Sequence, residues 1–372
     1  MSATMSIRSL VAALAITTLP QVALAGPLNP PDGMPGPTMK TLDQVEPRRP
    51  INMDTVPGDG TAFYVINQSG SYYLTGMAIV TGDIIAIQVN APNVVIDLNG
   101  FMVVRSTPAA STKPLIRVSN SAYGDVTIKN GTIRNAGGHG IELAGSNSRV
   151  ENVTVTTPGG HGIYAYGARN QILNCIIDTP KLDGINVGDE AMVMNSQVQG
   201  STTHGITTGA NSEVRSSRVK TAGQNGINVG SGTLVQDCTV STATAFGIAA
   251  QFNTGTQRFI NNTVTNCGSG GMRIYSTSQV VGNTVNLTGL NVPGLTIFSD
   301  GSRVQNNLFI GGTHAVTIDA SGDDNLVFGN QAVNPGTGNG FGNVNVANNQ
   351  VGPIVTAGGT IASTNPFANF SH

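Results

Sequence analysis

The sequence predicts an all-β chain wound as a right-handed parallel β-helix, a solenoid of about ten coils. The pair Gly-Ile returns at steps of 22, 22, 21, 21 and 21 residues, with its glycines at Gly140, Gly162, Gly184, Gly205, Gly226 and Gly247. Between these pairs lie short runs of Val, Ile and Leu with period-two spacing, and none of them is long enough for a helix. A coil of this length can bury its apolar row only by stacking on the next coil.

A second motif, V-x-N-x-x-V, follows the same period and predicts an asparagine ladder. Its central residue is asparagine in four successive repeats, Asn130, Asn152, Asn174 and Asn195. Stacked amides can hydrogen-bond along the stack and close the turns. We also expect the isoleucines of the Gly-Ile pairs to form one buried ladder, made of Ile141, Ile163, Ile185, Ile206, Ile227 and Ile248. A leucine-rich repeat has a similar period, but the leucine-dense consensus that it needs is missing.

Composition agrees with a turn-rich all-β chain. The 372 residues include 48 Gly and no Trp, and only 10% are charged. The net charge of -2 gives no basic surface for nucleic acid, and no motif indicates a cofactor. Cys175 and Cys238 hold the same repeat position three coils apart, about 14 Å, so the three cysteines are expected to be buried and unpaired.

The N-terminal part predicts export. Residues 1–25 have the pattern of a secretory signal peptide, with Arg8, an apolar stretch and Ala23-Leu24-Ala25 before Gly26. We therefore expect a secreted or periplasmic protein with no membrane span after cleavage. Residues 26–62 are expected to form a Pro-rich tether and an N-terminal cap, with a short helix at Thr38–Glu46.

Residues 63–330 are expected to form the β-helix itself. Its first stretch, Phe63–Gly76, alternates around Ser69-Gly70 and fits either a hairpin or the first coil. Past residue 330 the repeat decays, which predicts an irregular C-terminal cover or a flexible tail over 331–372. Phe367 and Phe370 are candidates to plug the open end.

The Gly-Ile and asparagine motifs resemble those of secreted right-handed β-helix proteins of the pectin-lyase-like superfamily, including NosD-type repeat proteins. The resemblance covers residues 93–330 and implies the fold rather than one activity, because the superfamily includes lyases, glycosidases, epimerases and adhesins. Gly138-His139-Gly140 and Gly160-His161-Gly162 also match the G-H-G motif of polygalacturonase-type hydrolases. Leu182-Asp183-Gly184 matches only half of their N-T-D-G motif, and no second carboxylate accompanies Asp183 in its column.

The position before each Gly of Gly-Ile is the candidate site. Its occupants in four consecutive coils are His139, His161, Asp183 and His204. If this column faces outward, we expect Asp183 to transfer a proton or orient an imidazole, with His161 and His204 as catalytic partners. The expected substrate-binding residues are His139, Glu142, Tyr164, Tyr166 and Asn186, because tyrosine beside amide, imidazole and carboxylate suits a sugar ring.

The function predicted from these residues is binding, and in the stronger form cleavage, of an extracellular polysaccharide by a hydrolase or lyase mechanism. Three alternatives remain open from the sequence. The column could only cap turns, a role that suits His, Asn and Asp. The chain could be a non-enzymatic surface or matrix spacer or adhesion protein, since the near-constant repeat leaves little room for loops beside a groove. His161, Asp183 and His204 are also the ligand set of a two-histidine, one-carboxylate metal site in a periplasmic protein.

Overall fold

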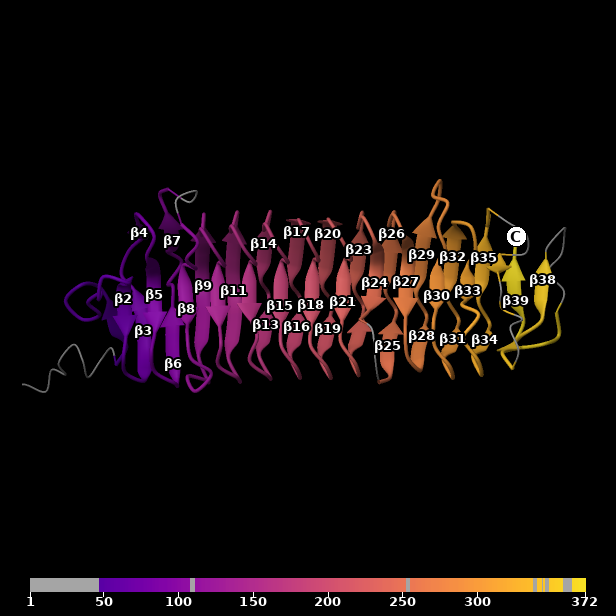
Figure 1. The fold of residues 1–372 in the computed structure, drawn as a ribbon, viewed down its shortest axis with the longest axis horizontal. Coiled ribbons are helices and arrows are strands. Elements are labelled where there is room, and N and C mark those ends of the chain that lie inside the picture. The colour runs from indigo at the N-terminus through magenta and orange to yellow at the C-terminus, as the bar shows by residue number, and fades with distance from the viewer. Residues whose placement is uncertain are drawn as a thin grey trace, which may run out of the picture. The chain divides into compact units, whose positions relative to one another are not determined.

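The computed structural model describes residues 47–107, 111–251, 255–336, 340–342, 344, 348–356 and 363–372. The chain divides into two units, Met1–Glu46 and Pro47–His372, and the first lies outside the described residues together with the expected signal peptide and the helix at Thr38–Glu46. The second unit is a stack of coils. Figure 1 shows its strands side by side along one axis, from indigo at one end to yellow at the other.

In the described residues all strand pairings are parallel and fall into two sheets, one of 26 strands (sheet A) and one of 13 (sheet B). Each coil contributes one strand to sheet B. These strands are β2 (Ala62–Ile66), β5 (Ile85–Val89), β8 (Ile116–Val118), β10 (Ile141–Leu143), β12 (Ile163–Ala165), β15 (Ile185–Val187), β18 (Ile206–Thr208), β21 (Ile227–Val229), β24 (Phe246–Ala250), β27 (Gly270–Ile274), β30 (Leu295–Ile297), β33 (Val316–Ile318) and β36 (Phe341–Gly342).

Sheet A contains two rows of strands, because each coil contributes two strands to it with a turn between them. The first row holds β1 (Arg49–Ile51), β3 (Gly70–Leu74), β6 (Val94–Asp97), β13 (Gln171–Leu173), β16 (Met192–Met194), β19 (Glu213–Arg215), β22 (Leu234–Gln236), β25 (Gln257–Ile260), β28 (Ser278–Val281), β31 (Arg303–Gln305), β34 (Leu326–Phe328) and β37 (Gln350–Val351). The second holds β4 (Ala78–Val80), β7 (Met102–Arg105), β14 (Ile176–Asp178), β17 (Gln197–Ser201), β20 (Arg218–Ala222), β23 (Thr239–Ser241), β26 (Thr263–Thr265), β29 (Thr284–Leu287), β32 (Leu308–Gly311), β35 (Gln331–Val333), β38 (Ile354–Thr356) and β39 (Asn369–Ser371). β9 (Thr127–Arg134) and β11 (Arg149–Thr156) pass through both rows.

The predicted fold class is confirmed, but the stack is longer than the expected ten coils. The 13 strands of sheet B give about 13 turns in the described residues. The extra coils lie mainly before residue 140, where β2, β5 and β8 lack the Gly-Ile pair. β2 and β3 do not form a hairpin: they pair in parallel with β5 and β6, so Phe63–Gly76 belongs to the first coil.

The predicted isoleucine ladder is the core of the stack. The six isoleucines from Ile141 to Ile248 are fully buried and pair directly from coil to coil. The glycine before each is required by close approach rather than by a special backbone angle. A Cβ added at Gly205 would lie 2.3 Å from Cγ1 of Val219, a valine of the V-x-N-x-x-V motif. The two motifs therefore recur together because they touch across the coil.

The asparagine ladder is the part of the fold that was wrongly predicted. Asn130, Asn152, Asn174 and Asn195 adopt the left-handed conformation, with φ between 52° and 59°. Asparagine tolerates this conformation better than most residues, so the turn rather than a ladder accounts for the motif. Within the column, amides link only Asn152 to Asn130, at 3.3 Å.

A buried ladder exists one residue later in each coil. It begins with Cys175, Ser196, Ser217 and Cys238 and becomes an amide ladder at Asn262, Asn283, Asn307, Asn330 and Asn369. Nδ2 of each of the first four asparagines donates to Oδ1 of the next one at 2.9–3.1 Å. The same oxygen accepts the backbone N–H of the preceding coil, so this ladder satisfies polar groups inside the stack. The cysteines are free and buried, as predicted, and burial raises the pKa of Cys175 and Cys238 to about 12.

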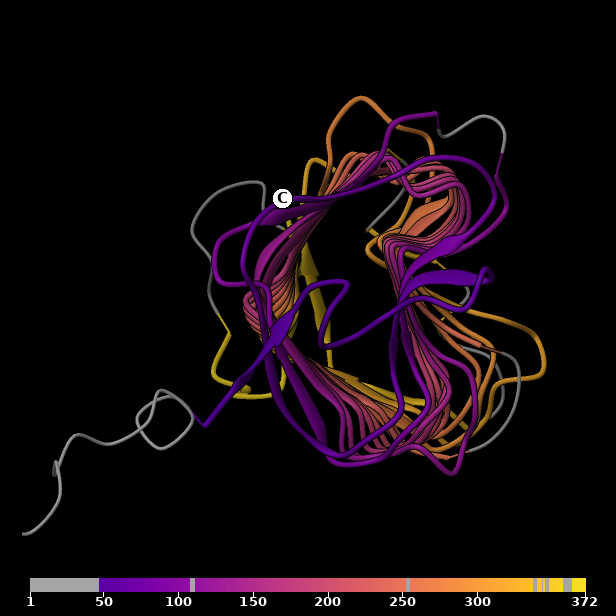
Figure 2. The ribbon, with the colours of Figure 1, turned by 90° about the vertical axis from the view of Figure 1, so that its left-hand side faces the viewer.

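The chain crosses the N-terminal end of the described stack and extends sheet A at the other end. After β1 a turn closed by Val56 N–H and the Asn52 carbonyl buries Val56, and Figure 2 shows this indigo segment crossing the end of the coil. At the other end β39 joins β35, and Ala368 and Asn369 are buried. Phe367 is 56% exposed, so it is not the predicted plug, and Phe370 is half-buried. Among the described residues no helix is long and apolar enough to cross a membrane.

Candidate functional site

The histidine and aspartate column crosses the N-terminal ends of the strands of sheet B, and each of its residues lies just before a strand. Every side chain in it accepts a hydrogen bond from the backbone N–H of the next coil. The acceptors are Nδ1 of His139 (3.0 Å, to residue 161), Nδ1 of His161 (3.1 Å, to 183), Oδ1 of Asp183 (2.9 Å, to 204), Nδ1 of His204 (3.2 Å, to 225) and Oδ1 of Asn225 (3.2 Å, to 246). The column is therefore a ladder of caps that ties one coil to the next, and it is called the cap ladder below.

The cap ladder fixes the protonation of its imidazoles. A nitrogen that accepts an N–H bond carries no proton, so the neutral rings of His139, His161 and His204 hold theirs on Nε2. Burial, with the neighbouring His161 and Arg117 charges, lowers the pKa of His139 to about 4. Burial also lowers the pKa of His161 and His204, although the nearby Asp183 opposes it. All three imidazoles are thus neutral near pH 7.

Asp183 is the most enclosed member of the ladder, with 5% of its surface exposed. Its Oδ1 accepts the Thr203 hydroxyl and the His204 N–H, and its Oδ2 accepts Asn186 Nδ2 at 2.8 Å. Burial raises the pKa of Asp183, but these hydrogen bonds outweigh it and hold the pKa below its ordinary value. Nδ1 of His161 lies 3.8 Å from Oδ2. The carboxylate is therefore ionised and already hydrogen-bonded at neutral pH.

Next to the ladder, four rings form one cluster on the outer face of β10 and β12, named the tyrosine patch: His139, His161, Tyr164 and Tyr166. The two imidazoles stack with centroids 5.0 Å apart and planes at 19°. Tyr164 stacks on His161 at 5.0 Å and 24°, and Tyr166 lies 4.9 Å from Tyr164. Tyr166 is 43% exposed, so the patch presents an aromatic surface to solvent.

Polar side chains flank the tyrosine patch in the same outward column of sheet B. The strand register places Arg117, Glu142, Tyr164 and Asn186 in consecutive coils. Arg117 Nε and Glu142 Oε1 form an ion pair at 3.4 Å. Beyond Arg117 a pocket of about 520 Å³ continues toward the N-terminal end, with Asp83 and Lys113 in its lining.

The structure thus brings seven of the eight predicted site residues onto three adjacent coils, and His204 lies one coil further. Arg117 was missed because β8 has no Gly-Ile pair. Extending the outward column one coil toward the N-terminus would have found it.

The metal alternative has no ligand set in the described residues, where no group of three or more His, Cys, Asp or Glu side chains could hold an ion. Within the cap ladder, Nδ1 of His161 and Nδ1 of His204 each accept a backbone N–H. The lone pair of each Nδ1 is therefore already used and is not free to bind a metal.

Comparison with known proteins agrees with the fold. The A-module of the mannuronan C-5 epimerase AlgE6 from Azotobacter vinelandii superposes with a TM-score of 0.62 at 16% identity, covering 82% of this chain and 90% of the module. The AlgE4 A-module from the same organism gives 0.57 at 14% identity, covering 72% and 88%. The PL6 family alginate lyase AlyGC gives 0.50 at 11% identity, covering 80% of this chain and 50% of the lyase. At these identities the similarity shows the fold alone, and no curated protein sequence matches the chain.

A family model supplies the assignment. The model described as "right handed beta helix region" matches residues 115–249 and 188–365, which together span more than half of the chain. The two ranges contain the Gly-Ile repeats, the cap ladder and the tyrosine patch. The predicted resemblance to pectin-lyase-like β-helices is thereby confirmed, and the chain belongs to the right-handed β-helix family.

Proposed function

We propose that this chain binds a polysaccharide on the outer face of sheet B, centred on the tyrosine patch. The observation that carries the proposal is the exposed ring of Tyr166 beside Tyr164, held in place by two stacked imidazoles. Sugar rings present C–H faces that pack on aromatic side chains, while their hydroxyls need hydrogen-bond partners nearby. Glu142 and Asn186 supply such partners on the two adjacent coils.

The patch is also prepared for binding before a ligand arrives. The imidazoles are fixed by their Nδ1 hydrogen bonds and Tyr164 is fixed by stacking, so little side-chain freedom remains to be lost. Rigid aromatic side chains contribute contact area at low entropic cost. This localised patch favours binding over a plain spacer, whose surface would be uniform along the stack.

The names of the similar structures agree with this class of ligand. Two are mannuronan epimerases and one is an alginate lyase, so each acts on a polysaccharide. Because fold does not imply function, they support the class of ligand and not an activity. We further propose, from the pattern at residues 1–25, that the protein is exported and meets such a ligand outside the cytoplasm.

Binding is better supported than cleavage. Inverting and retaining glycoside hydrolysis both need two carboxyl groups beside the scissile bond. Here Asp183 is buried and fully hydrogen-bonded, and Glu142 is paired with Arg117. A catalytic role for Asp183 with His161 and His204 stays a prediction, to be tested by assaying glycan turnover in wild type and Asp183→Asn.

A glycan-binding screen of the wild type and Tyr166→Ala tests the proposal. We expect the wild type to retain one class of polysaccharide and Tyr166→Ala to bind it about tenfold more weakly, as for loss of one aromatic contact. Tyr275→Ala is the matched control, because Tyr275 follows its strand of sheet B as Tyr166 does, five coils later. Equal binding by wild type and Tyr166→Ala would refute the proposed location, and no binding by the wild type would favour the spacer.

A further inference from the structure

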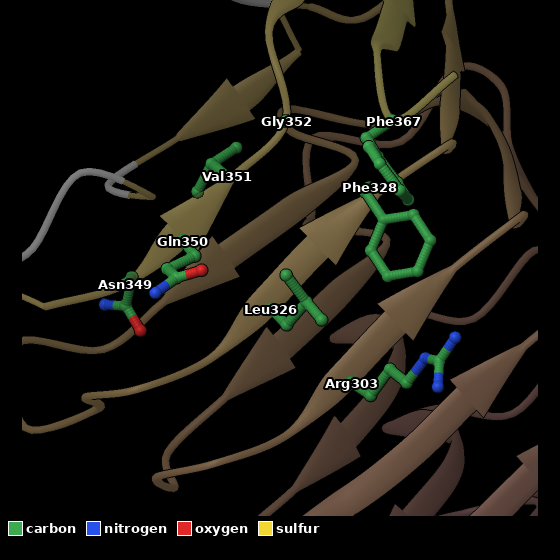
Figure 3. Close-up of a pocket in the computed structure, with 8 residues that line it drawn as sticks. All are labelled: Arg303, Leu326, Phe328, Asn349, Gln350, Val351, Gly352 and Phe367. Atoms are coloured by element: carbon green, nitrogen blue, oxygen red, sulfur yellow. The ribbon is translucent and has the colours of Figure 1, made fainter. Parts of the chain in front are cut away.

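A second pocket lies on the outer face of sheet A, near the C-terminal end of the stack and on a different sheet from the tyrosine patch. Its volume is about 680 Å³. β31, β34, β37 and the segment before β39 supply its lining, which includes Arg303, Leu326, Phe328, Gln350, Val351 and Phe367. Figure 3 shows Phe328 between the guanidinium of Arg303 and the ring of Phe367, with Leu326 beside it.

The wall of this pocket is apolar and open to solvent. Leu326 is 39% exposed and Phe367 is 56% exposed, although they are 41 residues apart in the chain. Phe328 and Phe367 meet edge to face, with centroids 5.5 Å apart and planes at 77°. Clustered exposed apolar side chains of this kind commonly mark a binding site.

The pocket carries one formal charge. The guanidinium carbon of Arg303 lies 5.3 Å from the centroid of Phe328, and its Nε donates to Gln305 Oε1 at 2.7 Å. These contacts hold the side chain against the apolar wall. No acidic residue lines the pocket, and among the described residues no carboxylate forms an ion pair with Arg303. The terminal nitrogens of Arg303 are therefore oriented and able to donate hydrogen bonds to an anion.

We propose that this pocket binds a small aromatic carboxylate. The ring would pack against Leu326 and Phe367, and the carboxylate would accept hydrogen bonds from the terminal nitrogens of Arg303. A bare inorganic anion would leave the apolar wall exposed, and a neutral ring would leave the guanidinium without its partner. The pocket volume lies within the range of about 300–1,000 Å³ that is usual for small-molecule sites. This site is independent of polysaccharide binding.

Equilibrium dialysis of the full chain against 2-naphthoate and its neutral analogue 2-naphthamide tests the proposal. We expect naphthoate to bind about ten- to a hundredfold more tightly than naphthamide, because a hydrogen bond to a charged group is lost in the amide. Arg303→Gln is expected to lower the affinity for naphthoate by a similar factor and to leave naphthamide unchanged. Phe367→Ala is expected to weaken both ligands by about two- to tenfold.

The chain offers a matched control for Arg303. Arg258 is exposed and occupies the same outward column of sheet A two coils earlier, with Gln279 between them. Arg258→Gln removes the same charge at the same strand position away from the pocket, so naphthoate binding should be unchanged. The proposal is overturned if the wild type binds naphthamide as tightly as naphthoate or binds no naphthoate. It is also overturned if Arg303→Gln binds naphthoate like the wild type, or if Arg258→Gln loses as much affinity as Arg303→Gln. Circular dichroism of each variant excludes unfolding as the cause.

Discussion

Acid should weaken this fold through the cap ladder, and His139 allows the effect to be isolated. Its Nδ1 accepts the backbone N–H of His161, so protonation of Nδ1 replaces a hydrogen bond by a clash between two donors. Arg117, His161, Tyr164 and, one coil beyond His161, Asp183 are the charged or titratable groups around it. The chain itself supplies the conservative substitution, because Asn225 fills the same position and caps the next coil through Oδ1. His139→Asn should keep the cap and remove the titration.

The size of the stability loss at low pH follows from the shift in the pKa of His139. Folding lowers the pKa of His139 from 6.5 to about 4, so the folded state binds fewer protons than the unfolded state between these values. Stability is then complete above pH 6.5 and is lost progressively as the pH falls toward 4. At about 1.4 kcal/mol for each pKa unit, His139 alone corresponds to a loss of about 3 kcal/mol. The lowered pKa values of His161 and His204 add to the loss in the same direction.

Urea unfolding followed by circular dichroism between pH 7 and pH 4 measures this loss. The wild type should lose several kcal/mol of unfolding free energy, and His139→Asn should lose about 3 kcal/mol less. His372→Asn is the control, because it removes an exposed imidazole at the end of the chain. An identical pH dependence in His139→Asn and the wild type would show that the cap ladder does not carry the acid sensitivity.

Four further outcomes are expected. Ile206→Ala should cost about 2–5 kcal/mol of unfolding free energy through the cavity it leaves, and a spectrum dominated by helix would contradict the fold itself. Asn283→Ala should cost about 1–3 kcal/mol, because the buried N–H of Asn262 loses its acceptor; an unchanged urea midpoint would count against the amide ladder. Gly205→Ala should cost about 1–3 kcal/mol by overpacking, and a stabilised variant would show that the neighbouring coil can yield. N-terminal sequencing of protein from its native host should begin at Gly26, and an intact cytoplasmic form would disprove export.

The register of the stack was predictable because period and alternation together determine it. Steps of 21 to 22 residues place each Gly-Ile pair over the previous one, and period-two alternation then decides which side chains face inward. The burial of Ile206 and the adjacency of Glu142, Tyr164 and Asn186 both follow from these two rules. They contain no information about loops or ends, so the coils without Gly-Ile pairs and the exposure of Phe367 were not predictable.

The position of the amide ladder depends on a finer property, the backbone conformation of a single turn residue. Asn174 is left-handed, and this turns its side chain away from the interior while directing Cys175 inward. A sequence pattern cannot separate the turn residue from the ladder residue, because asparagine suits a left-handed turn as well as a buried amide ladder. The later coils do show the distinction, since asparagine first enters the second column at Asn262 and recurs at Asn283, after the first column has begun to vary. The shift of one residue changes every partner in the ladder.

The two roles expected of the histidine column, capping and ligand contact, are linked rather than alternative. Nδ1 of His139 and of His161 accepts a backbone N–H, which holds both rings in one orientation. In that orientation His161 stacks on Tyr164 and His139 contacts it at a tilt of 43°. The contact surface that we propose therefore consists of Tyr164 and Tyr166 rather than of the histidines, which determine where those rings lie. Protonation that breaks the cap also moves the support of the tyrosine patch. Polysaccharide affinity and folding stability should consequently decline over the same interval, from pH 6.5 toward 4, and His139→Asn should weaken the pH dependence of both.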